Sequence, residues 1–598
     1  MDPSEINSRD AETTSPTQHA MAVVWGHFAR SIGLVERLMS VPISQKTVTH
    51  SPQAKILELL IGILCGIEYL TDLSEGAAPL SKDREVGEAW GLSGLSDASG
   101  VSRTLKACDD EVVGALQRAL DEVSQPFLDR AIHELLLRNA PLVLDADLTG
   151  RAVSSTSESY PGAAFGWMDG EVRLGYQLAE ICLQTPLFGR QWLSAQHHPG
   201  DRVPNSCLLS LLAAAEARMG CFPRRRPELL LPRLETCERA IAEAERLVSQ
   251  QVQRAEAQAA RIRRLTAQIE QARRQVLSLQ AQPASTRQAG PYSRLTQLQQ
   301  RLVGWEAQRE RARQQEAHAL MVAERHRRQL QLAVEAHDRL RQHYERLCQD
   351  NLRQSDPPRC TIRVDAGFSS GENLTTLIEL GDEVETKSGN AAVVHALRQQ
   401  VIETTPCTRV GKNAEMLAWT NYQISTCPYP LTVALERFHT PNGLLHAVLI
   451  RSQAGPVETA PDLVEWFQAY NARQTIEAGN KEEKTTFKLQ HLMSRSPGGI
   501  QIQALLTVFA ANFVRWAHEW IQPRVQHSSR RFDGVLSSPK RLVRVAANSP
   551  ASLDRSDGRL LLRFSPLSTF ADVVIRLSGA PSIQLALPLF TTHHFSSA

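Results

Sequence analysis

Three acidic residues of this chain have the side chains and the setting to hold divalent metal ions. Asp147 and Asp365 each end a short apolar segment that predicts a strand, and Glu477 lies in a segment that predicts helix. Two acids at one sheet edge, faced by a third from a helix, can hold two cations about 4 Å apart, as in-line displacement at a phosphodiester requires. Because carboxylate oxygens are hard ligands, we expect two Mg²⁺ ions, with Mn²⁺ as a substitute.

The first acid has an alternative. Asp145 and Asp147 are two positions apart in the same predicted strand, so their side chains point to the same face of the sheet. The residues alone leave the choice between them open.

Cations and an aromatic residue surround Glu477. Tyr470, Arg473 and Lys484 fall on one face if a single helix runs through the segment, and Lys481 is close by. Arginine contacts a phosphate with two parallel hydrogen bonds, and lysine acts as a point charge. The pattern is typical of a metal ligand placed beside a phosphate clamp.

These spacings resemble those of a known enzyme group. The pattern Tyr-x2-Arg-x3-Glu-x6-Lys, from Tyr470 to Lys484, is similar to the signature of bacterial insertion-sequence DDE transposases. Asp-x-Asp-x-Thr at 145–149 and Asp-x-Gly-Phe at 365–368 resemble the first two acid motifs of that group. The helix containing Ala-Asn-Phe-Val-Arg-Trp at 511–516 resembles the one that follows its glutamate.

The resemblance covers roughly 141–228 and 353–525 and implies a ribonuclease H-like catalytic core that cuts and joins DNA. It favours Asp147 over Asp145, because Asp147 opens the Asp-x-Thr step. By position it implies that Asp147, Asp365 and Glu477 are the metal ligands and that Tyr470, Arg473 and Lys484 contact DNA. Lys481, in the same segment, is a further predicted DNA contact. It also implies double-stranded DNA as partner (transposon ends and target), a homodimer when two ends are held together, and a bacterial cytoplasmic protein at the nucleoid.

A long helical hairpin departs from that group's pattern. Apolar or small residues recur at an unbroken interval of seven from Leu234 to Val276, which indicates a coiled coil. Pro283 and Pro291 interrupt the pattern, and residues 295–352 again have the composition and spacing of a helix. We therefore expect an antiparallel coiled-coil hairpin inserted between the first and second catalytic acids. The sequence does not indicate what this hairpin does.

The expected fold is an α/β ribonuclease H-like core with a helical N-terminal domain and this insertion. Strand-like segments at 415–424, 431–439 and 445–451 predict a small β insert at about 380–455. The predicted parts are a disordered tail at 1–18, a helical domain at 19–140 that is a candidate for DNA binding, the first part of the core at 141–228, the hairpin at 229–352, the second part of the core at 353–525, and a linker with a strand-rich region at 526–598.

Composition sets limits on the function. The chain has 598 residues, which suggests about three to five domains, and its 66 basic and 64 acidic residues exclude a uniformly basic polyanion binder. The longest apolar run, nine residues from Leu59 to Ile67, falls short of the ~20 needed for a membrane span, so no membrane partner is expected. Ten cysteines without a Cys-x-x-Cys pair favour free thiols in a reducing compartment.

Two other functions stay open. A non-catalytic DNA-binding or scaffolding relative would work through its coiled coil and keep the acids as remnants. A ribonuclease H-like nuclease would share the metal chemistry but would not need the Tyr-Arg-Glu-Lys face.

Overall fold

The computed structural model describes residues 13–46, 49–154, 160–283, 290, 293–402, 405–424, 426–441, 443–452, 461–556 and 559–578. The chain forms two compact units. The first, here called the core unit, comprises Met1–Arg224 and Asp356–Ala598, and the second, the hairpin unit, comprises Arg225–Ser355. The expected hairpin at 229–352 falls within the second unit.

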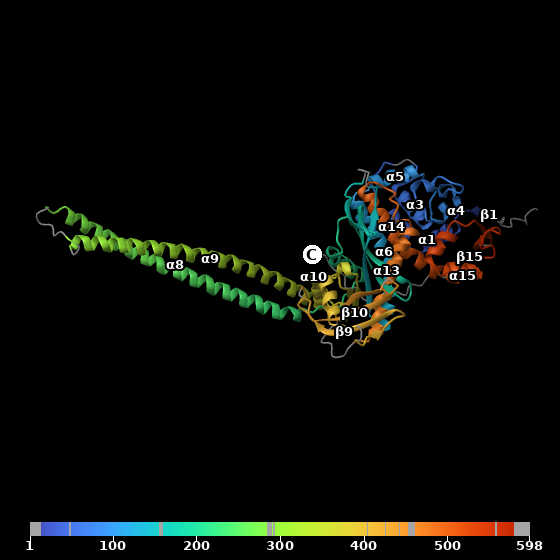
Figure 1. Ribbon diagram of the computed structural model, residues 1–598. Helices are drawn as coiled ribbons and strands as arrows, with labels where there is room; N and C mark the ends of the chain where they lie inside the picture. Colours follow the sequence, from blue (N-terminus) through green and yellow to red (C-terminus); the bar gives the residue numbers. More distant parts are fainter. Residues whose placement is uncertain are drawn as a thin grey trace, which may run out of the picture. The chain divides into compact units, whose positions relative to one another are not determined.

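A large mixed sheet organises the core unit (Figure 1). Its strands run in the order β3-β4-β2-β6-β7-β11-β10-β9-β8, and β5 pairs with β4. The central pairs β2–β6 and β6–β7 are parallel, and the other pairs are antiparallel. The strands are β2 (Leu142–Ala152), β3 (Ala164–Met168), β4 (Glu171–Thr185), β5 (Gly189–Pro199), β6 (Cys360–Arg363), β7 (Glu383–Lys387), β8 (Thr408–Arg409), β9 (Ala414–Tyr422), β10 (Leu431–Thr440) and β11 (Gly443–Arg451).

The centre of the sheet is covered on both faces. In β4, the residues from Gly175 to Leu183 are buried without alternation, which is the pattern of a strand packed on both sides. The sequence predicts short strands at 173–178 and 181–183, and the structure has one long strand instead. The strands of the expected β insert also differ from the prediction, because β11 pairs with β7 and so extends the main sheet instead of forming a separate piece.

Helix α14 (Pro497–Ile521) lies among the N-terminal helices (Figure 1). Its Phe513 ring lies 5.1 Å from Phe28 of α1, and its Trp516 stacks on Phe127 of α6 at 4.4 Å. The N-terminal helices, expected as a domain of their own at 19–140, therefore share one hydrophobic core with α14 and other parts of the core unit. These helices are α1 (Ala20–Ser31), α2 (Leu34–Met39), α3 (Pro52–Leu64), α4 (Arg84–Ala89), α5 (Ala98–Ala107) and α6 (Asp110–Leu137).

The segment Pro497–Arg524 is, by length and composition, apolar enough to cross a membrane, and 83% of its most apolar window is buried inside the protein. Its side chains supply much of the core described above.

The two ends of the chain meet in a second sheet. Strand β1 (Thr13–Thr17) pairs antiparallel with β13 (Ala551–Ser556), so the expected disordered tail is wrong for residues 13–17. The sheet order is β1-β13-β14-β15-β12, with β14 (Arg559–Phe564), β15 (Val574–Arg576) and β12 (Val525–His527). Part of the expected linker forms α15 (Arg530–Leu536), and residues 542–546, within the region expected to be strand-rich, are helical. The last part of that region, 579–598, lies outside the described residues.

Two long helices, α8 (Leu231–Gln280) and α9 (Arg294–Arg353), form the hairpin unit. At 1.5 Å per residue they are about 75 and 90 Å long. The seven heptad positions from Leu234 to Val276 are all buried or half-buried, and Arg273 of α8 pairs with Glu306 of α9 at 2.5 Å. The heptad face of α8 is therefore the face that packs on α9.

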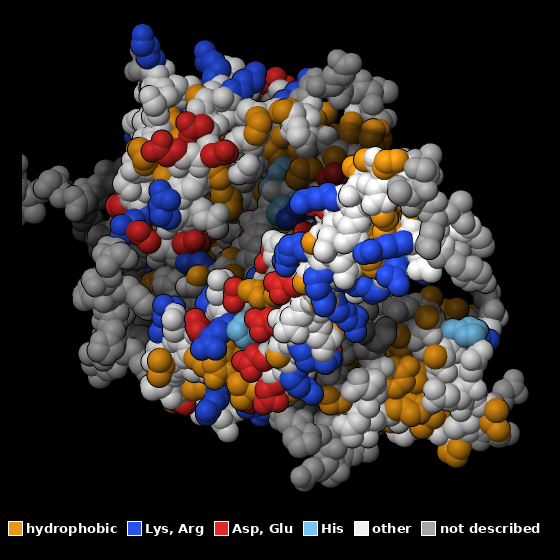
Figure 2. Space-filling model, turned by 90° about the vertical axis from the view of Figure 1, so that its left-hand side faces the viewer, with side chains coloured by type: hydrophobic (Ala, Val, Ile, Leu, Met, Phe, Trp, Pro, Cys, Tyr) orange, Lys and Arg blue, Asp and Glu red, His pale blue; other side chains and the backbone are white. Residues whose placement is uncertain are grey.

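The remaining helices of the core unit are α7 (Leu208–Met219), α10 (Gly371–Leu380), α11 (Ala391–Gln399), α12 (Leu463–Asn471), α13 (Gln474–Thr485) and α16 (Pro539–Arg541). On the face shown in Figure 2, Lys and Arg side chains mix with Asp and Glu and with apolar side chains.

Candidate active site

Asp147 on β2 lies between helix α13 and the sheet. Its Oδ1 accepts a hydrogen bond from Arg473 Nη2 at 3.1 Å, and its Oδ2 accepts one from Asn480 Nδ2 at 2.7 Å. Burial raises its pKa to about 6; Arg473 opposes this rise, and the charges of Asp365 and Glu477 add to it. Asp365 and Glu477 therefore both lie close enough to Asp147 for their charges to disfavour its ionised form.

Asp145 has a different environment. Its carboxylate is fully buried and accepts hydrogen bonds from Arg363 Nε at 2.6 Å, Arg363 Nη2 at 2.8 Å and Gln184 Nε2 at 2.6 Å. This is a two-pronged ion pair between neighbouring strands, and it uses both oxygens of Asp145. Asp147 differs in that 15% of its side chain is exposed, against none of that of Asp145, and each of its oxygens accepts a single hydrogen bond from a side chain.

Asp365 follows β6 and caps the short helix Ala366–Phe368. Its Oδ1 accepts from the backbone N–H of Gly367 at 2.9 Å, and its carbonyl accepts from Thr386 Oγ1 at 3.0 Å. A Cβ at Gly367 would lie 2.9 Å from Pro204 Cγ and 3.1 Å from the capping oxygen of Asp365. The glycine of the Asp-x-Gly-Phe motif therefore lets the chain turn tightly beside the acid.

Arg473 joins the first and third acids. Its guanidinium contacts Asp147, and its Nη1 lies 3.2 Å from Glu477 Oε1. The Arg473 side chain is 7% exposed and that of Glu477 is 62% exposed. Burial alone would lower the pKa of Arg473, but Asp147, Tyr470 and other nearby acids outweigh it and raise the pKa. Arg473 thus lies as a cation between two predicted metal ligands, and its contact with a DNA phosphate stays a prediction.

The side chains that were expected on one face of a single helix are divided between two helices. Helix α12 ends at Asn471 and α13 begins at Gln474, so Tyr470 and Glu477 lie on different helices. Tyr470 is buried, and its hydroxyl donates to the carbonyl of Val364 at 3.3 Å. Burial also raises its pKa. The hydroxyl of Tyr470 therefore connects α12 to the end of β6, and its contact with DNA stays a prediction.

The two lysines of α13 differ. Lys481 is exposed, whereas Lys484 Nζ lies 3.3 Å from Asp169 Oδ1 with 20% of its side chain exposed. Of the four predicted DNA contacts, Lys481 is the one that the structure leaves open to solvent.

Two buried acids behind the site, Glu180 and Glu483, were not predicted from the sequence. Glu180 of β4 is the cross-strand neighbour of Asp147, and both Glu180 and Glu483 of α13 are fully buried. Burial raises the pKa of each, and the charge of Glu483 adds to the rise at Glu180; none of the four carboxyl oxygens has a hydrogen-bond partner among the described residues. A glutamate within the apolar run Leu178–Leu183 was the available signal.

Two arginines hold α13 in place. Arg190 Nη2 and Arg515 Nη2 donate to Glu482 Oε2 at 2.6 and 2.8 Å, and Arg190 Nη1 donates to the carbonyl of Thr475 at 2.7 Å. A Cβ at Gly479 would lie 2.6 Å from Arg190 Nε. Glycine inside this helix therefore makes room for the guanidinium that fixes it.

The donor set fits a hard divalent cation in type. Asp147, Asp365 and Glu477 supply carboxylate oxygens and influence one another electrostatically. Within the described ranges, however, no three His, Cys, Asp or Glu side chains lie close enough together to hold an ion.

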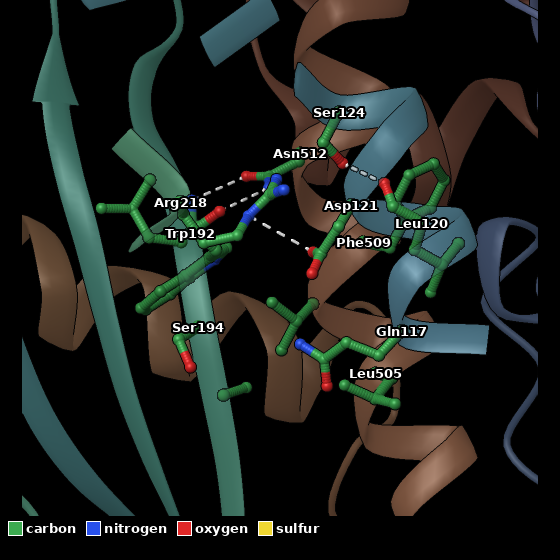
Figure 3. A pocket seen from close by; sticks show the side chains of 13 residues that line it. Gln117, Leu120, Asp121, Ser124, Trp192, Ser194, Arg218, Leu505, Phe509 and Asn512 are labelled. Carbon is green, nitrogen blue, oxygen red and sulfur yellow. Dashed lines mark hydrogen bonds and ion pairs between the residues drawn. The ribbon is translucent and has the colours of Figure 1, made fainter. Parts of the chain in front are cut away.

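A small cavity of about 40 Å³ lies away from these acids, between α6, β5 and α14 (Figure 3). The Asn512 amide accepts from the backbone N–H of Trp192 at 2.9 Å and donates to its carbonyl at 3.0 Å. Arg218 pairs with Asp121 at 3.3 Å. The cavity is too small for a nucleotide, and its polar groups join elements of the core.

No family model matches the chain, and no curated protein matches it. Among solved structures, the chain is similar to a piggyBac transposase in a synaptic complex with hairpin DNA, with 8% identity and a TM-score of 0.35 over 90% of this chain and 83% of that one. The similarity is distant, and the resemblance to bacterial insertion-sequence transposases stays a prediction.

Proposed function

We propose that this protein is a DDE transposase that cleaves DNA at transposon ends and transfers the freed strand into target DNA with two Mg²⁺ ions. The observation that supports the proposal is that Asp365 follows the strand paired with that of Asp147, while Arg473 bridges Asp147 and Glu477. Asp145 of β2 pairs in register with Arg363 of β6, so Asp147 and Asp365 follow on neighbouring parallel strands. Glu477 joins them through Arg473.

The sheet supports a ribonuclease H-like core. Strands β5, β4 and β2 form an antiparallel set, and β6 and β7 continue it in parallel to β2. The helices α8 and α9 follow β5 and precede β6, so the proposed coiled-coil insertion lies between the first two acids.

In the proposed mechanism, Asp147, Asp365 and Glu477 would hold the ions, which when bound would supply activation of the attacking oxygen and stabilisation of charge on the phosphate. Asn480 orients Asp147 through its hydrogen bond to Oδ2. Arg473, once released from the carboxylates, would be free to face the phosphate backbone, and Lys481 would contact it directly. Asp145 and Arg363 keep the two acid-bearing strands aligned.

The test is Mg²⁺-dependent cleavage of the DNA flanking the gene, with strand transfer scored as joining to a target plasmid. Glu477→Gln removes one ligand charge and is expected to abolish cleavage while DNA binding persists. Glu465→Gln, an exposed acid on α12, is the matched control and is expected to cleave like the wild type. Full cleavage by Glu477→Gln would remove Glu477 from the proposed triad.

A second function, a non-catalytic DNA-binding relative, is favoured by one observation. Arg473 already neutralises Asp147 and Glu477, which would leave the acids as a structural ion-pair network. Electron paramagnetic resonance of added Mn²⁺ separates the two functions. Two bound ions that are lost in Asp147→Asn support the enzyme, and no bound ion supports the non-catalytic relative.

A further inference from the structure

Charge is distributed unevenly between the two units. The hairpin unit, Arg225–Ser355, carries 24 arginines, no lysine and 15 acids, a net of +9. The rest of the chain carries 42 basic and 49 acidic residues, a net of −7. The whole-chain value of +2 therefore conceals a basic hairpin and an acidic core unit.

Within the hairpin, the charge gathers near the turn. We call residues 261–280 of α8 and 294–313 of α9 the turn end, and the hairpin residues outside 261–313 the base. The turn end has ten arginines and three glutamates, whereas the base has 13 arginines and 12 acids. The arginines of the turn end are Arg261, Arg263, Arg264, Arg273, Arg274, Arg294, Arg301, Arg309, Arg311 and Arg313.

Few of these charges are neutralised within the hairpin. Arg273 pairs with Glu306 at 2.5 Å, and Arg313 lies 3.9 Å from Glu310. Four others are exposed and form no ion pair with any described residue: Arg261, Arg263, Arg264 and Arg274. A coiled coil with interleaved opposite charges describes the base, where Arg246 pairs with Glu243 at 2.6 Å, but not the turn end.

The size of the turn end suits a duplex. Twenty helical residues span about 30 Å, which is the length of about nine base pairs at 3.4 Å each. Like charges separated by less than the Debye length, about 8 Å at physiological salt, repel one another, and a polyanion relieves that repulsion. The guanidinium fork also matches phosphate oxygens.

We propose that the turn end of the hairpin binds the phosphate backbone of double-stranded DNA without reading its sequence. Phosphate contacts position a protein on DNA but carry no sequence information. The choice of DNA over another polyanion rests on the proposed function, whereas the basic surface itself does not.

The test uses the full-length protein in EDTA, so that binding is measured without cleavage. Fluorescence anisotropy with a labelled 30-base-pair duplex of arbitrary sequence is recorded over a range of KCl concentrations. The turn-end variant replaces Arg261, Arg263, Arg264 and Arg274 by glutamine. The control variant removes four exposed arginines of the base in the same way: Arg254, Arg325, Arg339 and Arg346.

The turn-end variant should release fewer counterions on binding. At ~0.9 per phosphate contact, the slope of log K against log salt should fall by up to about 3.6. Lowering the salt fourfold would then strengthen wild-type binding about 150-fold more than binding by the variant. The control variant should keep nearly the wild-type slope. An unchanged slope in the turn-end variant, or an equal loss in the control, overturns the proposal.

A second measurement needs no variant. Phenylglyoxal modifies exposed arginines of the wild-type protein, and mass spectrometry with and without duplex shows which ones DNA protects. Protection of Arg261, Arg263, Arg264 and Arg274, with Arg339 and Arg346 still modified, supports the proposal; the reverse pattern overturns it. Tighter turn-end binding to polyglutamate or single-stranded RNA than to duplex overturns the choice of DNA. Loss of cleavage in Glu477→Gln is scored separately, so the two proposals can fail independently.

Discussion

Replacing Asp145 by asparagine is expected to destabilise the core unit strongly, although the change is nearly isosteric. The three groups that contact Asp145 are all donors: two guanidinium N–H groups of Arg363 and the amide of Gln184. An asparagine would present an NH₂ group to at least one of them, and the Arg363 charge, on a side chain that is 6% exposed, would lose its counter-charge. Breaking a buried ion pair in this way costs about 3–5 kcal/mol.

The same substitution at Asp147 is the matched comparison. Burial raises the pKa of Asp147 to about 6, so the folded protein disfavours its ionised form. Asn480 Oδ1 is buried without a hydrogen-bond partner among the described residues, so rotation of that amide allows Asn480 to accept from the new NH₂ group. We therefore expect Asp147→Asn to change the free energy of unfolding by no more than about 1 kcal/mol while removing metal binding.

Urea denaturation followed by tryptophan fluorescence measures both variants. Eight of the nine tryptophans belong to the core unit, so the signal reports mainly on its unfolding. The double variant Asp145→Leu with Arg363→Met removes both charges and should recover most of the lost stability. Wild-type stability in Asp145→Asn, or an equal loss in Asp147→Asn, would refute the assignment of Asp145 to structure and Asp147 to chemistry.

Two further predictions concern buried groups. Burial raises the pKa of Glu58 from 4.5 to about 8, so the folded state holds a proton there that the unfolded state releases, and stability is lost as pH rises from about 4.5 to 8. Glu58→Gln should gain stability relative to the wild type between pH 5 and pH 8, by roughly 3–4 kcal/mol, and an equal difference at both pH values in urea melts would contradict this. Gly479→Ala should lower stability by about 1–3 kcal/mol despite its better helix propensity, because the new methyl group displaces Arg190 from Glu482; thermal melts of Gly479→Ala beside Arg190→Ala test whether the two losses overlap.

The sequence by itself determined the local elements that carry the acids. A short apolar segment ending in an acid was enough to predict the strands before Asp147 and Asp365, since strand formation there depends on neighbouring residues. The heptad spacing likewise predicted the face of α8 that packs on α9, because every seventh residue of a helix returns to the same side. In both cases the signal is periodic and local.

The tertiary structure decided how the predicted site residues are used. Tyr470 and Arg473 match a DNA-contact pattern in sequence, but their side chains are buried against β6 and Asp147. Spacing specifies a helix face only while the helix continues, and here it turns at Ala472 and Arg473. Whether a cation on that face meets phosphate or carboxylate depends on strands more than 300 residues earlier in the chain, such as β2 with Asp147.

Contacts between residues far apart in the sequence also determined two features that no local sequence pattern predicts. Residues 13–17 have no apolar periodicity, and they are ordered because β13, over 500 residues later, supplies backbone partners. Asp145 and Asp147 cannot be told apart by position in a strand, since both point to the same face. Arg363 and Gln184 surround the first and Arg473 and Asn480 reach the second, and these partners come together only when the sheet and α13 assemble.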